Sequence, residues 1–74
     1  MISGTLTRQV DEIGTAAGLV WSYLDENGPA TFSKIARDVD APRDLVMQGV
    51  GWLAREGKVT SQEGARGKLI SLTT

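Results

Sequence analysis

The chain contains no cysteine and no histidine. These absences exclude disulfides, thiol nucleophiles, Cys/His metal sites and histidine general bases. A lack of cysteine also fits a reducing cytoplasm. Long apolar runs are missing too, since none approaches the roughly 20 residues that span a bilayer. The first residues, MISGTLTRQV, lack the pattern of a secretion signal. We therefore expect a soluble, cytoplasmic protein without a membrane partner.

Motifs that would bring catalytic groups together are also missing. Carboxylates and hydroxyls are present, but no paired acidic motif and no phosphate-binding glycine loop positions them. The segment GARG at residues 64–67 is too short for a nucleotide loop and fits a hairpin turn. We predict that the protein is not an enzyme and that it holds neither a cofactor nor a metal.

The composition is that of one small globular domain. The 74 residues are 41% hydrophobic and 23% charged, and the formal net charge is −1. Residues 1–28 hold one basic and four acidic residues, whereas residues 58–74 hold three basic residues and one acidic residue. Such polarity can orient a protein on a polyanion. Ordinary scatter of surface charge in a short chain explains it equally well.

The apolar spacing predicts a first helix over residues 9–26. One stripe recurs at three- and four-residue steps, formed by Val10, Ile13, Ala17, Val20 and Leu24. The sequence Asn-Gly-Pro at residues 27–29 stops this helix, because Gly and Asn accept left-handed geometry and Pro cannot continue a helix. Residues 1–8 precede it, and their pattern fits either a loose arm or a short strand.

Two more helices are expected in the middle of the chain. The segment FSKIARDVD forms a short helix with Thr31 as its N-cap. After a turn through DAPR, a third helix begins, and Asp40 is placed to cap its first amides. This helix ends at Gly57, a residue suited to a left-handed C-cap.

The spacing of the apolar residues changes after Gly57 from a helical pattern to that of strands. Val59 and Thr60 begin a strand, residues 63–67 supply turn chemistry, and the segment LISL returns as a second strand. An isolated hairpin is only marginally stable, so these strands need a third partner or a helix beneath them. The expected fold class is α+β, with three helices followed by a β-hairpin.

The third helix carries the most specific pattern of the chain. Its apolar ridge and the following turn read V-x-x-G-V-x-x-L-x-x-x-G-x-V over residues 46–59. This sequence resembles the third helix and first wing strand of winged helix-turn-helix domains. IGTAAGLVW and GWLAREGKV are similar to segments of a family of short, stand-alone prokaryotic winged-helix proteins of uncharacterised function. The resemblance spans about residues 12–72. We predict one domain over residues 9–74, preceded by an arm or short strand at 1–8.

Winged helices usually bind DNA, so the resemblance implies a nucleic-acid-binding protein that acts in transcription regulation. In the third helix, the face opposite the ridge carries Asp44, Gln48, Gly51 and Arg55. Gln can pair with adenine and Arg with guanine. Because the same face also carries a carboxylate and a glycine, we expect it to recognise base sequence only weakly. The candidate DNA-binding residues are Arg43, Gln48, Arg55, Lys58, Arg66 and Lys68.

The hairpin carries part of this set. Arg66 and Lys68 are two residues apart, so on a strand they point to the same side and can contact phosphates. Charges on an edge strand also discourage aggregation, which explains the same pattern without DNA.

Two tryptophans and two glycines need a structural reason. Trp21 and Trp52 are expected in the core, although Trp52 lies at a flank where it can also anchor a partner. Glycine inside a helix costs about 1 kcal/mol relative to alanine, so Gly14 and Gly18 predict close packing. The expected neighbour is intramolecular, for example Trp52, with a second copy of the chain as the alternative.

The sequence therefore favours double-stranded DNA as partner, bound weakly or with low specificity. The alternative is a module for protein interaction or dimerisation that does not touch nucleic acid. A symmetric dimer would suit paired half-sites. The candidate dimer residues are Ile2, Leu6, Leu19 and Tyr23.

Overall fold

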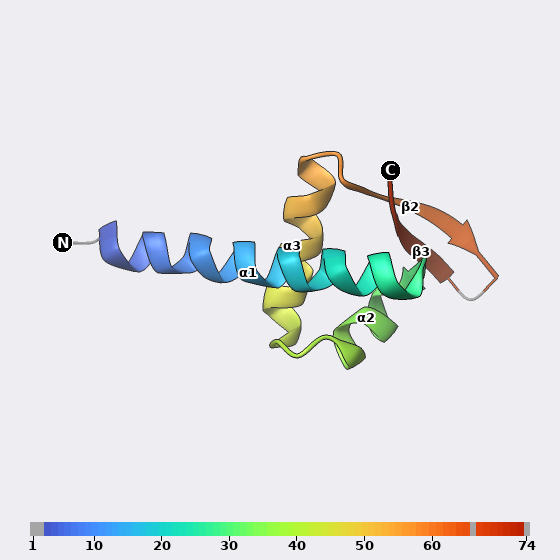
Figure 1. The fold of residues 1–74 in the computed structure, drawn as a ribbon, viewed down its shortest axis with the longest axis horizontal. Helices are drawn as coiled ribbons and strands as arrows, with labels where there is room; N and C mark the ends of the chain where they lie inside the picture. The colour runs from blue at the N-terminus through green and yellow to red at the C-terminus, as the bar shows by residue number, and fades with distance from the viewer. Residues whose placement is uncertain (1–2, 66, 74) are drawn as a thin grey trace.

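The computed structural model describes residues 3–65 and 67–73, with side chains from residue 12 onward. Three helices and one three-stranded sheet follow in the order α1 (Ser3–Asn27), β1 (Ala30–Thr31), α2 (Phe32–Asp38), α3 (Arg43–Arg55), β2 (Val59–Gly64) and β3 (Gly67–Leu72). Helix α3 crosses α1, α2 lies to one side of the crossing, and the β2–β3 hairpin extends at the end opposite the N-terminus (Figure 1). The predicted α+β winged-helix fold is confirmed.

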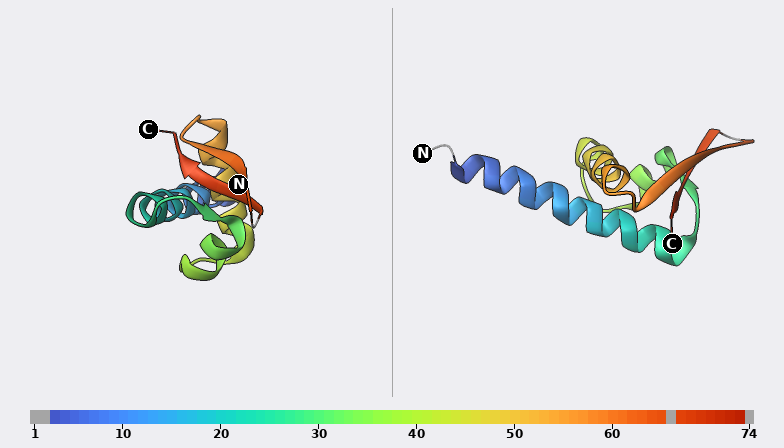
Figure 2. Two further views of the ribbon diagram at one scale, coloured as in Figure 1. Left: turned by 90° about the vertical axis from the view of Figure 1, so that its right-hand side faces the viewer. Right: turned by 90° about the horizontal axis from the view of Figure 1, so that it is seen from above.

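Helix α1 is longer than the apolar stripe predicted. It begins at Ser3, so the expectation of an arm or a strand over residues 1–8 is wrong for residues 3–8, while residues 1–2 lie outside the described range. Its first turns project beyond the rest of the domain (Figure 2). The predicted stop is confirmed: the Gly28 amide donates to the Leu24 carbonyl at 2.8 Å, and Gly28 has a φ of 78°. None of the helices in the described residues has the length and apolar character to cross a membrane.

Helix α2 starts as predicted, and α3 does not. The Lys34 amide donates to Thr31 Oγ1 at 3.2 Å, which makes Thr31 the N-cap of α2. Helix α3 has Pro42 as its N-cap, and within the described turn no side chain bonds its first amides. The expected cap by Asp40 is therefore wrong, because Asp40 lies two residues before the position from which a side chain reaches those amides.

The buried ridge of α3 lies where its spacing predicts. Val46 and Leu53 are buried in one core with Val20, Leu24 and Ile35, while Val50 is half-buried at the edge. The helix ends in a two-bond motif: the Lys58 amide donates to the Leu53 carbonyl at 2.8 Å, and the Gly57 amide to the Ala54 carbonyl at 3.0 Å. Gly57 takes a φ of 73°, which confirms the left-handed C-cap.

The third strand that the hairpin needs comes from the chain before α2. Strand β3 lies between β1 and β2 in an antiparallel sheet. Ala30 pairs with Ile70, and both are buried in the core. The Thr73 amide and hydroxyl donate to the Lys58 and Gly57 carbonyls at 3.0 and 2.8 Å. These bonds tie the end of the sheet to the end of α3.

Candidate nucleic-acid interface

The face of α3 opposite the buried ridge is open to solvent. Gln48, Gly51 and Arg55 are exposed, as the spacing predicts, and Met47 beside them is 57% exposed. Asp44 is exposed in the first turn of the helix, where its carboxylate suits the positive end of the helix dipole. The face therefore offers one amide, one guanidinium and one carboxylate to a partner.

Arg43 is positioned by an aromatic ring on α2. Its Cζ atom lies 5.0 Å from the centroid of the Phe32 ring, a cation–π arrangement that leaves the guanidinium N–H donors available. Phe32 also lines a groove of about 280 Å³ between α3 and the hairpin. Val50 and Ala54 of α3 and Lys68 of β3 line the same groove. We call it the wing groove; Lys68 lines it, and Arg43 lies over the ring of Phe32, another of its lining residues.

The two hairpin lysines in the described residues, Lys58 and Lys68, line different hollows of the surface. Lys68 is exposed, and its backbone partner in the strand register is Glu63. Lys58 lies elsewhere: its Nζ is 3.6 Å from Glu56 Oε1, and it lines a hollow that contains Trp52. Arg66, the remaining hairpin candidate, lies outside the described residues. The structure therefore does not bring Lys58 together with Lys68.

Carboxylates are interleaved with these cations. Asp44 follows Arg43, Glu56 pairs with Lys58, and Glu63 faces Lys68 across the strands. An exposed ion pair such as Lys58–Glu56 contributes little to stability, about 0–1 kcal/mol. For a polyanion the carboxylates matter more, because they lower the positive potential that attracts phosphates.

Both tryptophans are partly exposed, so the expected core position is wrong for Trp21, and for Trp52 the structure fits the alternative position at a flank. Trp21 is 38% exposed and Trp52 is 39% exposed. They line one hollow with Gly14 and Gly18, and we call this surface the Trp face. Within the described part of the chain, a β-carbon on either glycine would meet nothing within 4 Å. The predicted close packing of Gly14 and Gly18 inside the molecule is therefore also wrong.

Close approach of the helices occurs at a different glycine. A β-carbon on Gly49 would lie 2.9 Å from the Ala17 backbone nitrogen and 3.0 Å from the Ala16 carbonyl carbon. Gly49, the glycine of the V-x-x-G-V pattern, thus lets α3 cross α1 at short range.

The predicted dimer residues are in different environments. Leu19 is 40% exposed. Tyr23 is half-buried against the core, and its hydroxyl donates to Asp38 Oδ2 at 2.7 Å. Hydrogen bonds from Arg37 and then from Tyr23 lower the pKa of Asp38 below its ordinary value. Ile2 and the side chain of Leu6 lie outside the described part of the structure.

Comparison with known proteins places this geometry in a family. Residues 7–72 match the family model described as a winged helix-turn-helix domain (DUF2582). The chain belongs to this family. The DUF2582 chain is also similar to protein BT2368 from Bacteroides thetaiotaomicron, known from a solution NMR structure. That similarity has a TM-score of 0.73 and 32% sequence identity, and covers 84% of this chain and 76% of the other. No curated protein matches the chain.

Membership of the DUF2582 family confirms the winged-helix fold and the sequence resemblance on which it was first predicted. The family is one of uncharacterised function. What the domain binds therefore depends on the chemistry of its surface residues.

Proposed function

We propose that this DUF2582 domain binds nucleic acid, with duplex DNA as its partner, and acts in transcription regulation. The observation that carries the proposal is the wing groove. Arg43 lies over the Phe32 ring that lines it, and Lys68 also lines it. A phosphate backbone lying along the groove would meet a cation from α3 and a cation from the hairpin.

In this arrangement the exposed face of α3 enters the major groove. Gln48 and Arg55 are the side chains there that can bond base edges. Arg66, two residues before Lys68 in the sequence, adds a further phosphate contact in the proposal. Few cations and several carboxylates make binding weak and only slightly selective among sequences.

The test is a salt titration of binding to a fluorescent random-sequence duplex. With two or three phosphate contacts, the plot of log K against log salt has a slope of about −2 to −3. Lys68→Ala removes one contact and makes the slope shallower by about 1, whereas Gln48→Ala alters preference among sequences. Ser22→Asp is the control, because it lowers the net charge equally on the exposed side of α1. An equal loss in both charge variants would leave only a net-charge effect and would refute the site.

A second candidate function is protein interaction without nucleic acid. It is favoured by the exposure of large apolar side chains in so small a domain, namely Leu19, Trp21, Met47 and Trp52 among the described side chains. Under this function the wild-type protein shows no duplex binding at low salt, and Lys68→Ala has no effect on the partner unless that partner is acidic.

A further inference from the structure

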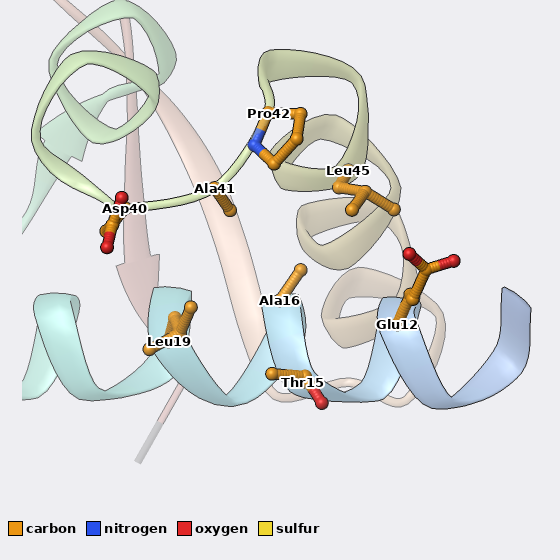
Figure 3. Close-up of a pocket in the computed structure, with 8 residues that line it drawn as sticks. All are labelled: Glu12, Thr15, Ala16, Leu19, Asp40, Ala41, Pro42 and Leu45. Carbon is orange, nitrogen blue, oxygen red and sulfur yellow. The ribbon is translucent and has the colours of Figure 1, made fainter. Parts of the chain in front are cut away.

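A second apolar groove lies on the other flank of α3. It has a volume of about 270 Å³ and runs between α1 and the turn that leads from α2 to α3. Figure 3 shows Ala16 and Leu19 of α1 on one side, with Ala41, Pro42 and Leu45 facing them. We call it the Leu19 groove. It shares no residue with the wing groove.

The sequence produces this groove through small residues. Gly49 brings α3 against the backbone of Ala16 and Ala17. One turn earlier on α3, Leu45 therefore stands over α1 beside the short side chain of Ala16. Leu19, one turn beyond Ala16 on α1, faces Ala41, which is too small to cover it. The result is a leucine that stays 40% exposed at the wall of a concave surface.

The rim of the groove is negative. Glu12 and Asp40 stand at its two ends (Figure 3), and Asp44 lines an adjoining hollow that shares Pro42 and Leu45. Among the described residues, no lysine or arginine lines either hollow. Asp40 and Asp44 supply most of this negative charge, one beside each end of the turn before α3.

The apolar lining and the acidic rim together determine which kind of molecule can bind in the groove. Nucleic acid is repelled by the carboxylates of Glu12 and Asp40, which line the groove itself. A second copy docked symmetrically would bring each acidic rim against its own duplicate, which is unfavourable. The volume is slightly below the range of about 300–1,000 Å³ typical of small-molecule pockets. It suits the apolar side chains of a peptide helix, the mode in which an amphipathic helix lies in a hydrophobic groove.

The Trp face is a weaker candidate for a defined partner. Its charged residues, Glu56 and Lys58, pair with one another at 3.6 Å, so it specifies no partner charge. In the Leu19 groove, by contrast, the charge on the partner is specified.

We infer that the Leu19 groove is a docking site for a basic amphipathic helix of another protein, with leucine-type anchors on Leu19 and Leu45 and lysine or arginine beside Asp40. This gives the second candidate function a surface and a partner chemistry. The groove itself contains none of the candidate DNA-binding residues, whereas the adjoining hollow with Asp44 includes one of them, Gln48.

The experiment titrates the isotope-labelled full chain with three synthetic helical peptides. The first has two leucines one turn apart, flanked by lysines; the second replaces the leucines with alanine, and the third replaces the lysines with glutamate. The first peptide should bind about tenfold more tightly than either of the others. Its binding should shift the amide signals of residues 12–19 and 40–45 and should weaken with salt.

Two variants locate the site. Leu19→Ala and Asp40→Asn should each weaken the first peptide severalfold, and both chains should fold because the side chains are exposed. Met47→Ala, which removes an exposed apolar side chain outside the groove, should leave peptide binding unchanged. Duplex binding should be unchanged in Leu19→Ala, so failure of this site and failure of the DNA site give different results.

Three outcomes would overturn the inference. One is equal affinity for the lysine and glutamate peptides. Another is signal shifts confined to the Trp face. The third is a wild-type dimer that Leu19→Ala converts to a monomer in sedimentation, which would make a second copy the occupant.

Discussion

The backbone nitrogen of Ala17 lies 2.9 Å from the position that a β-carbon on Gly49 would occupy. Real β-carbons do not come this close to backbone atoms, so the crossing of α1 and α3 requires glycine here. Gly49→Ala should destabilise the domain by about 1–3 kcal/mol, although alanine is the better helix former. Urea denaturation measures this change directly.

The matched controls are the glycines of the Trp face. Gly14→Ala and Gly18→Ala add a methyl group in open space, so each should stabilise the domain by up to about 1 kcal/mol through helix propensity. A loss of stability in either variant would mean that another chain packs closely on the Trp face.

The ridge of α3 should carry much of the stability. Leu53 is 4% exposed within the core, so Leu53→Ala should cost about 2–5 kcal/mol, a large part of the stability of so small a domain. Met47→Ala on the same helix should change stability by less than about 0.5 kcal/mol, because Met47 is exposed. Equal denaturation midpoints for the two variants would show that the helix is rotated from this position.

The Tyr23–Asp38 hydrogen bond gives a pH-dependent prediction. Because the pKa of Asp38 is lowered in the folded state, its contribution to stability is present above the ordinary carboxyl pKa and is lost as pH falls through the lowered value. Tyr23→Phe should raise the pKa of Asp38 toward its ordinary value, leaving the bond from Arg37 as the main cause of the remaining shift. A carboxyl titration followed by NMR measures this. An unchanged pKa would show that the hydroxyl does not bond Asp38 in solution.

The features that the sequence predicted correctly depend on local chemistry. Thr31 caps α2 through an amide three residues away, and Gly57 ends α3 because it adopts a positive φ. The buried ridge follows from helical spacing alone. The exposure of Gln48 and Arg55 follows from the same spacing, because they lie opposite the ridge.

The features that it missed depend on how two helices cross. Spacing gives the centre of a buried face but not its width, which is set by the approach of α3 to α1 at Gly49. The Trp21 and Trp52 rings fall at the rim of that contact instead of inside it. The stacking of Arg43 on Phe32 likewise joins two helices and has no local signal. Residues 3–8 lack an apolar stripe, yet α1 continues through them.

The central claim is that α3 and the hairpin contact DNA. Amide signals recorded while a short duplex is added at about 50 mM salt, where phosphate contacts are strong, test it most directly. The account predicts that signals from residues 43–55 and 58–68 move, while those of residues 14–22 on α1 stay in place. If the signals of residues 43–55 and 58–68 do not move, the DNA proposal is contradicted.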